Sequence, residues 1–267
     1  MTALSLLLAA TLVSAAPATP PGDEAVRLTP EQAREIGMKI WRNEAGGKVE
    51  LLTHWNKDED FASLGIGHFI WYVAGRPGPF TESFPGLLDA YEAAGQALPA
   101  WLQGRPSCPW TGRDAFYADF AGPRLVELRE LLARTVDIQA RYAARRLEDA
   151  LPKVLAAADS GQRPKLKARF YAVAASPNGL YALVDYVNFK GEGINPKERY
   201  DALGWGLIQA LELMDDAAAG QPSVEAFARG ADAALTRRVA HAPPARREIE
   251  RGWLAGWRKR LKTYAQP

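Results

Sequence analysis

The apolar residues between positions 29 and 45 recur every three or four residues, which is the spacing of an amphipathic helix. They are Ala33, Ile36, Ile40 and Trp41. The helix is expected to begin at Thr29-Pro30-Glu31-Gln32, which has a capping threonine and a glutamine three residues later. Two consecutive glycines, Gly46 and Gly47, are expected to end it. One more turn of the apolar stripe reaches Glu44, so this carboxyl is expected at the edge of the buried face.

The pattern changes to that of β-strands after this helix. Residues 49–55 and 61–73 are rich in β-branched and aromatic side chains, and the charged segment 56–60 between them is typical of a turn. We therefore predict a small antiparallel hairpin. Gly65 and Gly67 in its second half indicate close approach of another backbone or of a ligand.

The remainder of the chain has helical periodicity. Helices are expected over residues 81–95, 113–121, 123–158 with a break near Pro152, 165–175, 179–186, 198–218, 224–241 and 245–264. The sequence contains no internal repeat and no long linker. The expected fold is α+β and predominantly helical, with a small β-hairpin near the N-terminus and a single domain over residues 29–267.

The first 22 residues contain no charged side chain. An apolar run from Leu4 to Ala16, followed by a Pro-rich segment, is typical of a secretory signal that is cleaved after Ala15. The run is too short to span a bilayer as a helix. Its start lacks a basic residue, so an uncleaved N-terminal anchor is the alternative. Residues 1–15 are predicted to be a signal peptide and 16–28 a lead-in, which makes the protein exported, either periplasmic or secreted.

The composition and the absence of known motifs limit the kinds of catalysis that can be expected. The chain has 267 residues, of which 48% are hydrophobic and 24% charged, as in an ordinary globular protein. Cys108 is the single cysteine, which excludes an intrachain disulfide, and it has no signature of a catalytic nucleophile. Phosphate loops, nucleophile elbows, dinucleotide fingerprints and closely spaced metal ligands are absent from the sequence. No cofactor or metal is therefore expected.

The C-terminal segment is strongly basic. Residues 237–262 contain nine Lys and Arg against Glu248 and Glu250. Apolar residues at helical spacing predict an amphipathic helix that packs on the domain, and adhesion to an anionic envelope surface, either lipid or cell-wall polymer, is the alternative. Nucleic acid is not expected as a partner of an exported chain, and the sequence does not determine the oligomeric state.

Glu44, the hairpin and Ser63-Leu64-Gly65-Ile66-Gly67-His68 together resemble the catalytic front end of the lysozyme superfamily, especially phage-type lysozymes and endolysins. In that family a helix ends in the catalytic Glu, and the following hairpin carries a Thr-Ile-Gly-x-Gly-His sequence. The resemblance implies a lysozyme-like fold, Glu44 as general acid and Ser63 as the hydroxyl residue that faces the sugar. It also implies that Gly65, Gly67 and His68 bind substrate, which would be peptidoglycan or a related glycan with β-1,4-linked amino sugars.

The second carboxylate of the family is out of register in this chain. The family has an Asp or Cys six positions before its Thr, whereas Lys57 lies six positions before Ser63. Asp58 is the first choice for the catalytic partner and Glu59 the second. Without a partner carboxylate, the sugar's own 6-hydroxyl can attack the anomeric carbon, as in lytic transglycosylases. Glycoside hydrolase and lytic transglycosylase therefore both remain open.

Further residues are expected at the substrate. Trp55 and Tyr72 have faces suited to stacking on sugar rings. Asn188 and Glu192 belong to a polar segment, 185–193, that is expected to form a loop on the opposite wall of the cleft, with Glu192 as a fallback carboxylate. Gln209 ends a segment similar to the Gly-Leu-Met-Gln of goose-type lysozymes and lytic transglycosylases. The alternatives to an enzyme are a non-catalytic glycan-binding or envelope scaffold protein and an unrelated periplasmic helical protein.

Overall fold

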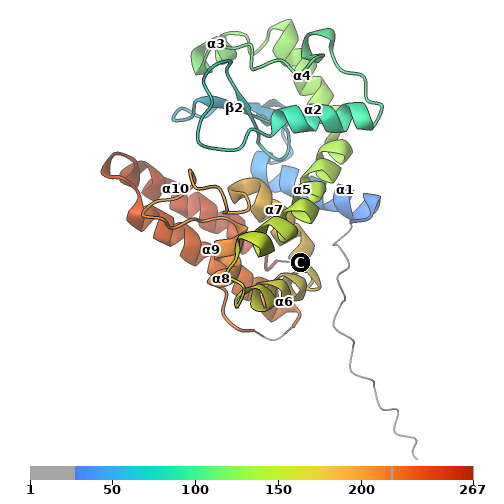
Figure 1. The fold of residues 1–267 in the computed structure, drawn as a ribbon. Coiled ribbons are helices and arrows are strands. Elements are labelled where there is room, and N and C mark those ends of the chain that lie inside the picture. The colour runs from blue at the N-terminus through green and yellow to red at the C-terminus, as the bar shows by residue number, and fades with distance from the viewer. Residues whose placement is uncertain (1–27, 218, 267) are drawn as a thin grey trace, which may run out of the picture.

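The computed structural model describes residues 28–217 and 219–266, and it has the predicted α+β, predominantly helical fold (Figure 1). The expected signal peptide and the lead-in up to residue 27 lie outside the described residues. In chain order the elements are α1 (Pro30–Ala45), the 3-10 helix η1 (Val49–Leu52), β1 (Thr53–His54), β2 (Phe61–Leu64), β3 (Phe69–Tyr72), α2 (Phe84–Ala93), η2 (Ala100–Leu102), α3 (Arg113–Ala118), α4 (Pro123–Arg134), α5 (Val136–Ala157), α6 (Arg163–Ala174), α7 (Gly179–Lys190), α8 (Leu207–Glu212), α9 (Gln221–His241) and α10 (Pro244–Lys262).

The elements form two lobes that α5 connects (Figure 1). The small sheet, α2, α3 and α4 make up the N-terminal lobe, and α6 to α10 make up the C-terminal lobe. α1 crosses α5 at close range, because a Cβ on Gly37 would overlap that of Ala140. The start of α1 has the predicted capping box, in which Thr29 and Gln32 exchange side-chain and backbone hydrogen bonds.

The β-region is a three-stranded antiparallel sheet in the order β1-β2-β3. His54 lies opposite Ser63, and Leu64 lies opposite Phe69. Two details of the predicted hairpin were wrong. Its first strand is mostly η1, and its second divides into β2 and β3 at the turn 65–68, because Gly65 has a φ of +68° that strand geometry does not allow.

The helical prediction also needs three corrections. The long segment 123–158 breaks at Thr135 and not near Pro152, which lies inside α5. The φ of Thr135 is −121°, which is not helical, and its hydroxyl donates to the Leu131 carbonyl at 2.6 Å. The predicted helix 198–218 is only α8, because residues 191–206 form a loop. Segment 185–193, which was expected to be that loop, is instead helical as far as Lys190.

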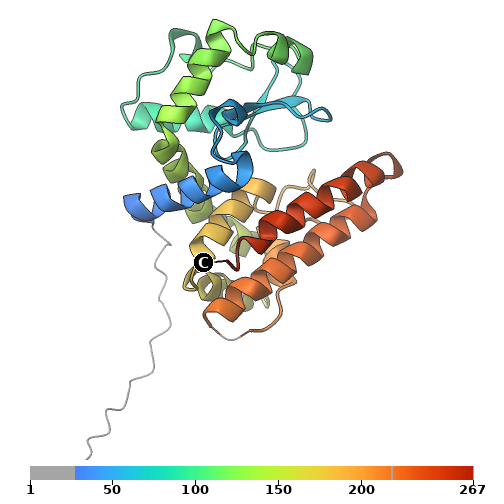
Figure 2. The same cartoon turned by 180° about the vertical axis from the view of Figure 1, so that it is seen from behind.

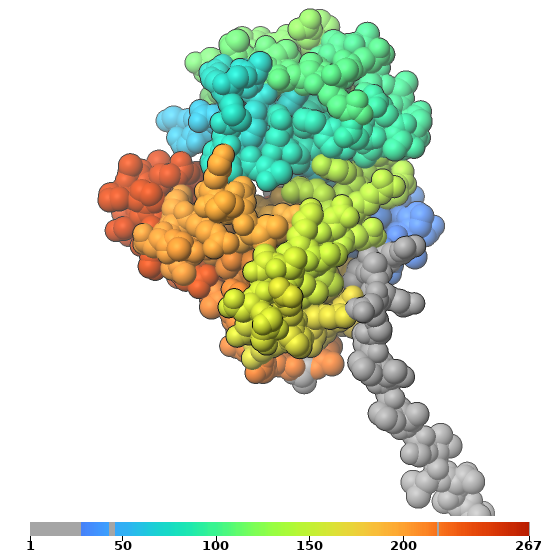
Figure 3. Space-filling model, in the orientation of Figure 1, coloured from blue at the N-terminus to red at the C-terminus, as the bar shows by residue number. Residues whose placement is uncertain are grey.

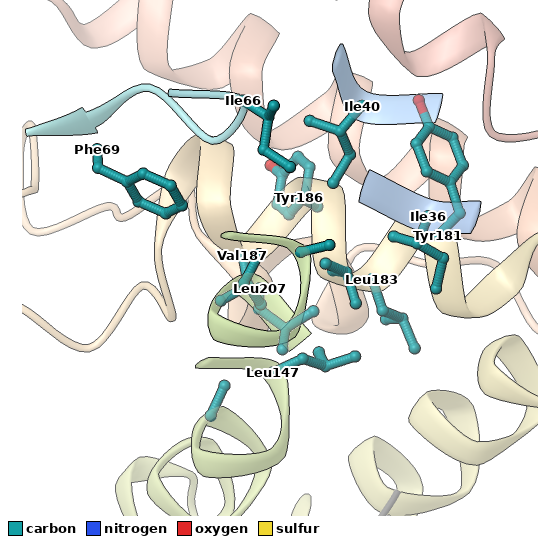
Figure 4. Close-up of a cluster of buried hydrophobic side chains, with 14 of the residues drawn as sticks. Ile36, Ile40, Ile66, Phe69, Leu147, Tyr181, Leu183, Tyr186, Val187 and Leu207 are labelled. Atoms are coloured by element: carbon teal, nitrogen blue, oxygen red, sulfur yellow. The ribbon is translucent and has the colours of Figure 1, made fainter. Parts of the chain in front are cut away.

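One cluster of buried apolar side chains extends through both lobes. Figure 4 shows its central part, where Ile40 of α1 and Ile66 of the turn point toward one another above the side chains of α7 and α8. The end of the first helix and the glycine-rich turn therefore adjoin.

The C-terminal helix packs on the domain, as predicted. α9 and α10 lie side by side, joined by a short turn (Figure 2). Leu261 and Tyr264 are buried, and Glu250 on the same helix is buried in an ion pair with Arg238 of α9. Among the described residues, no helix combines the length and apolar character needed to cross a bilayer.

Candidate functional site

The turn between β2 and β3 is hydrogen-bonded to a side chain of α5. Gln139 of α5 is fully buried, and its Oε1 accepts the backbone N–H of Ile66 at 3.0 Å. A Cβ on Gly65 would overlap this oxygen, and a Cβ on Gly67 would lie 2.7 Å from the ring of Phe69. Both glycines thus allow close approach, but the atoms nearest to them belong to the side chains of Gln139 and Phe69, whereas the sequence predicted another backbone or a ligand.

Glu44 lies in the last turn of α1, and its side chain is outside the described residues. Its backbone is one turn beyond Ile40, whose buried side chain points toward Ile66 (Figure 4). The helix end that carries the predicted acid therefore adjoins the turn that carries the Gly-Ile-Gly-His sequence.

Ser63 lies on β2, where it is buried, and its Oγ is 3.5 Å from Oε2 of Glu59. Glu59 is held in place through its own carbonyl, which accepts the indole N–H of Trp55 at 2.7 Å. Asp58 is exposed in the turn between β1 and β2. Of the two carboxylates considered, the structure places the second choice, Glu59, beside Ser63.

The charge of Glu59 acts on side chains in both lobes. Burial lowers the pKa of His68, and Glu59 opposes this shift. Burial raises the pKa of Tyr72 to about 12; the backbone hydrogen bond from Phe80 opposes this shift, and the carboxylates of Glu198, Glu82 and Glu59 add to it. Burial also places the pKa of Lys190, at the end of α7, well below its usual value, and Glu59 partly offsets that shift. The charge of Glu59 therefore acts across the junction of the two lobes.

The loop 191–206 reaches across from the C-terminal lobe to the segment after β3. Nδ2 of Asn195 donates to the Pro79 carbonyl at 3.3 Å and to Oε1 of Glu198 at 3.1 Å. Beside this bridge the surface is hollowed, between the teal N-terminal lobe and yellow-green α5 (Figure 3). We use the term cleft cluster for a set of side chains linked by hydrogen bonding or charge. Ser63 hydrogen-bonds to Glu59, the charge of Glu59 acts on His68, Tyr72 and Lys190, and the charge of Glu198 acts on Tyr72 and Lys190.

Two members of the cleft cluster were missed by sequence reasoning. Glu198 lies in the loop that was predicted to be a helix, and burial raises the pKa of its carboxyl despite the hydrogen bond from Asn195. Lys190 is the last residue of α7, directly before Gly191. The Asn195-Pro196 pair was the available signal, because the residue before a proline is disfavoured in a helix.

Three of the predicted substrate-binding residues make contacts within the protein. Trp55 is 2% exposed and packs edge-on against Phe116. Asn188 links α7 to α5 by accepting from Arg146 at 2.8 Å. Gln209 is buried and shapes the loop 191–206, since it accepts from the Gly206 N–H at 2.9 Å and donates to the Gly193 carbonyl at 3.1 Å.

Glu192 lies at the start of the loop 191–206, with its carboxylate 3.4 Å from Nζ of Lys153. Cys108 is buried, and burial raises the pKa of its thiol to about 12, so the reactive thiolate is disfavoured. Within residues 28–217 and 219–266, His, Cys, Asp and Glu side chains form no group of three that could hold a metal ion.

The cleft cluster combines carboxylates, a buried hydroxyl and a cation at the junction of two lobes. Such a site is suited to proton transfer to a bound ligand. Comparison with protein-family models, curated proteins and solved structures finds no match to this chain.

Proposed function

We propose that the protein is an exported, glycan-cleaving enzyme of the lysozyme type that acts on the β-1,4 linkages of peptidoglycan. The single observation that carries this proposal is that the end of α1 adjoins the turn that follows β2, the strand on which Ser63 lies beside Glu59. The proposal thus brings three features together. These are the end of α1 at Glu44, the Gly-Ile-Gly-His turn and the pair of Glu59 with Ser63.

In this proposal Glu44 protonates the glycosidic oxygen of the leaving sugar. Glycosidic cleavage passes through an oxocarbenium-like transition state, which a nearby carboxylate stabilises. Glu59 is the carboxylate for that role, because it lies beside Ser63 while Asp58 is exposed. The hydroxyl of Ser63 positions water or the sugar.

Whether water or the sugar's own 6-hydroxyl attacks depends on Glu59. If Glu59 orients a water molecule, the products have reducing ends. If Glu59 only stabilises the cation, the 6-hydroxyl closes on the anomeric carbon, its proton passes to the Glu44 carboxylate left by protonation of the leaving sugar, and the products carry anhydro ends. Mass spectrometry of the released fragments distinguishes a hydrolase from a lytic transglycosylase.

The test is digestion of purified peptidoglycan by the wild type and by matched carboxyl-to-amide variants. Glu44→Gln should abolish fragment release, and Glu59→Gln should reduce it by at least about 100-fold, the usual scale of acid-base catalysis. Asp58→Asn and Glu130→Gln, which change exposed carboxylates in the first turn of the sheet and on α4, should leave release unchanged.

Two results would contradict the proposal. Full activity of Glu44→Gln would show that Glu44 is not the general acid. Binding of peptidoglycan by the wild type with no fragment release would instead support the non-catalytic glycan-binding or scaffold alternative.

A further inference from the structure

We propose that the exposed side of α10 binds the surface of an anionic lipid bilayer. The inference goes beyond the proposed function, because it concerns a surface of the C-terminal lobe outside the cleft cluster. The sequence left packing on the domain and adhesion to an anionic surface as alternatives for this helix. In the structure the two roles use different sides of it.

One side of α10 packs on the domain and the opposite side is open. Glu250 and Leu261 on the packed side are buried. On the opposite side, Gly252 and Gly256 have nothing within 4 Å of the position that a Cβ would occupy. Figure 2 shows α10, in red, running along the surface of the C-terminal lobe beside α9. A flat partner can therefore approach this side of the helix closely.

The open side carries a row of cations. A helix rises about 1.5 Å per residue, so the row from Arg251 to Lys262 is about 16 Å long. Its members recur at helical spacing, which places them along one flank of α10. They line a hollow of about 500 Å³ whose lining residues are Arg251, Leu254, Ala255, Arg258, Lys259 and Lys262.

Two of the four cations are balanced within the protein. Arg251 pairs with Glu248 at 2.7 Å, and Arg258 pairs with Asp232 of α9 at 2.7 Å. Lys259 and Lys262 are exposed and form no ion pair within residues 28–217 and 219–266. The row thus has an excess of positive charge, which is complementary to a surface of phosphate groups.

Apolar side chains on the other flank of the open side favour a lipid surface over a soluble polyanion. Ile249 is 38% exposed, which is unusual for a large apolar side chain in this protein. One turn further along, Trp253 is partly exposed and contacts Trp257, with ring centroids 5.9 Å apart. Tryptophan and basic side chains together are typical of a helix that lies in a bilayer interface. A soluble polyanion would engage the cations only, whereas a bilayer also accommodates Ile249.

The experiment measures co-sedimentation of the full chain with vesicles of phosphatidylglycerol, which are anionic, and of phosphatidylcholine, which are zwitterionic. Every sample contains the apolar run at residues 4–16, so the readout is the ratio of the two affinities. The wild type should bind the anionic vesicles at least about 100-fold more tightly. The double variant Lys259→Gln/Lys262→Gln should reduce that ratio about 30-fold, because it removes the two unpaired cations.

The matched control removes the same charge elsewhere. Lys57→Gln/Lys197→Gln changes two exposed lysines, one in the turn between β1 and β2 and one in the loop 191–206, and should keep the wild-type ratio. Thermal melting checks that each variant folds.

A third variant separates a bilayer from a soluble polyanion. Ile249→Ser should weaken binding to the anionic vesicles at least about 3-fold, because it removes apolar surface that the bilayer would cover. Its binding to inorganic polyphosphate should equal that of the wild type.

Four outcomes would overturn the inference. Equal affinity of the wild type for both kinds of vesicle, or an unchanged ratio in Lys259→Gln/Lys262→Gln, would show that the row of cations is only a solvated face. An equal loss in the Lys57→Gln/Lys197→Gln control would show that net charge alone decides binding. Binding that Ile249→Ser leaves intact on both vesicles and polyphosphate would assign the surface to a soluble polyanion. None of these readouts depends on cleavage of a glycan, so the proposed function stands or falls separately.

Discussion

Oε1 of Gln139 accepts the backbone N–H of Ile66 at 3.0 Å, and this bond fixes the glycine-rich turn to the helix that joins the two lobes. Nε2 of the same side chain donates to the Leu132 carbonyl at 2.6 Å, just before the break between α4 and α5. One fully buried amide therefore couples the candidate site to the helix break.

Gln139→Ala should lower the free energy of unfolding by about 2–4 kcal/mol, because it leaves the Ile66 N–H without its acceptor, removes one of the donors to the Leu132 carbonyl and opens a cavity. Urea denaturation measures this change. Gln103→Ala replaces an exposed glutamine and should stay within about 0.5 kcal/mol of the wild type. A similar small effect for Gln139→Ala would refute the role of this residue.

Gly65→Ala should destabilise the protein more than Gly75→Ala. Both glycines have a positive φ, +68° and +70°, so each substitution carries a backbone cost of about 1–2 kcal/mol. Nothing lies within 4 Å of a Cβ on Gly75, whereas a Cβ on Gly65 would overlap Gln139. The overlap should bring the total for Gly65→Ala to about 3 kcal/mol. Equal melting temperatures for the two variants would contradict this prediction.

Acidification should destabilise the protein through His68. Burial lowers the pKa of His68 below its usual 6.5, although Glu59 acts in the opposite direction. The unfolded chain then takes up a proton more readily than the folded one, so stability is full above pH 6.5 and falls as the pH drops below it. His68→Asn, which tolerates the observed φ of 47°, should flatten this dependence. The measurement is urea denaturation between pH 6.5 and 5. If the free energy of unfolding of this variant falls with pH as steeply as that of the wild type, the prediction is refuted.

The ion pair of Glu250 gives a prediction at lower pH. Burial alone would raise the pKa of Glu250, but hydrogen bonds and charge from Arg238, together with Tyr200 and Arg246, lower it below its usual 4.5. The stability that this carboxylate contributes is therefore present above pH 4.5 and is lost as the pH falls below that value. Glu250→Gln should reduce the loss, as measured by urea denaturation at pH 5 and pH 3.

Arg238→Met should lower the free energy of unfolding by about 3–5 kcal/mol at neutral pH, because it leaves the buried carboxylate of Glu250 without its main partner. Arg251→Met is the matched control on α10, since Arg251 pairs with Glu248 at the surface and should contribute little. A cost for Arg238→Met no larger than that of the control would show that the buried pair is not needed.

The local signals in the sequence determined the elements that depend on near neighbours. The capped helix over 30–45, the antiparallel strands and the C-terminal amphipathic helix follow from caps, alternation and helical spacing within a few residues. The preference for Asp58 over Glu59 came from sequence register, which does not reveal which side chain turns toward Ser63.

Only the tertiary structure decided how the cleft is composed. Glu59 lies between β1 and β2 in the N-terminal lobe and Lys190 ends α7 in the C-terminal lobe, yet the charge of Glu59 acts on Lys190. Contacts between such distant residues depend on how helices pack, and local patterns along the chain carry little information about packing. The sequence by itself determined the capped first helix, the position of Glu44 in its last turn and the C-terminal helix, because these depend on near neighbours. Packing decided which charged groups act on one another across the two lobes.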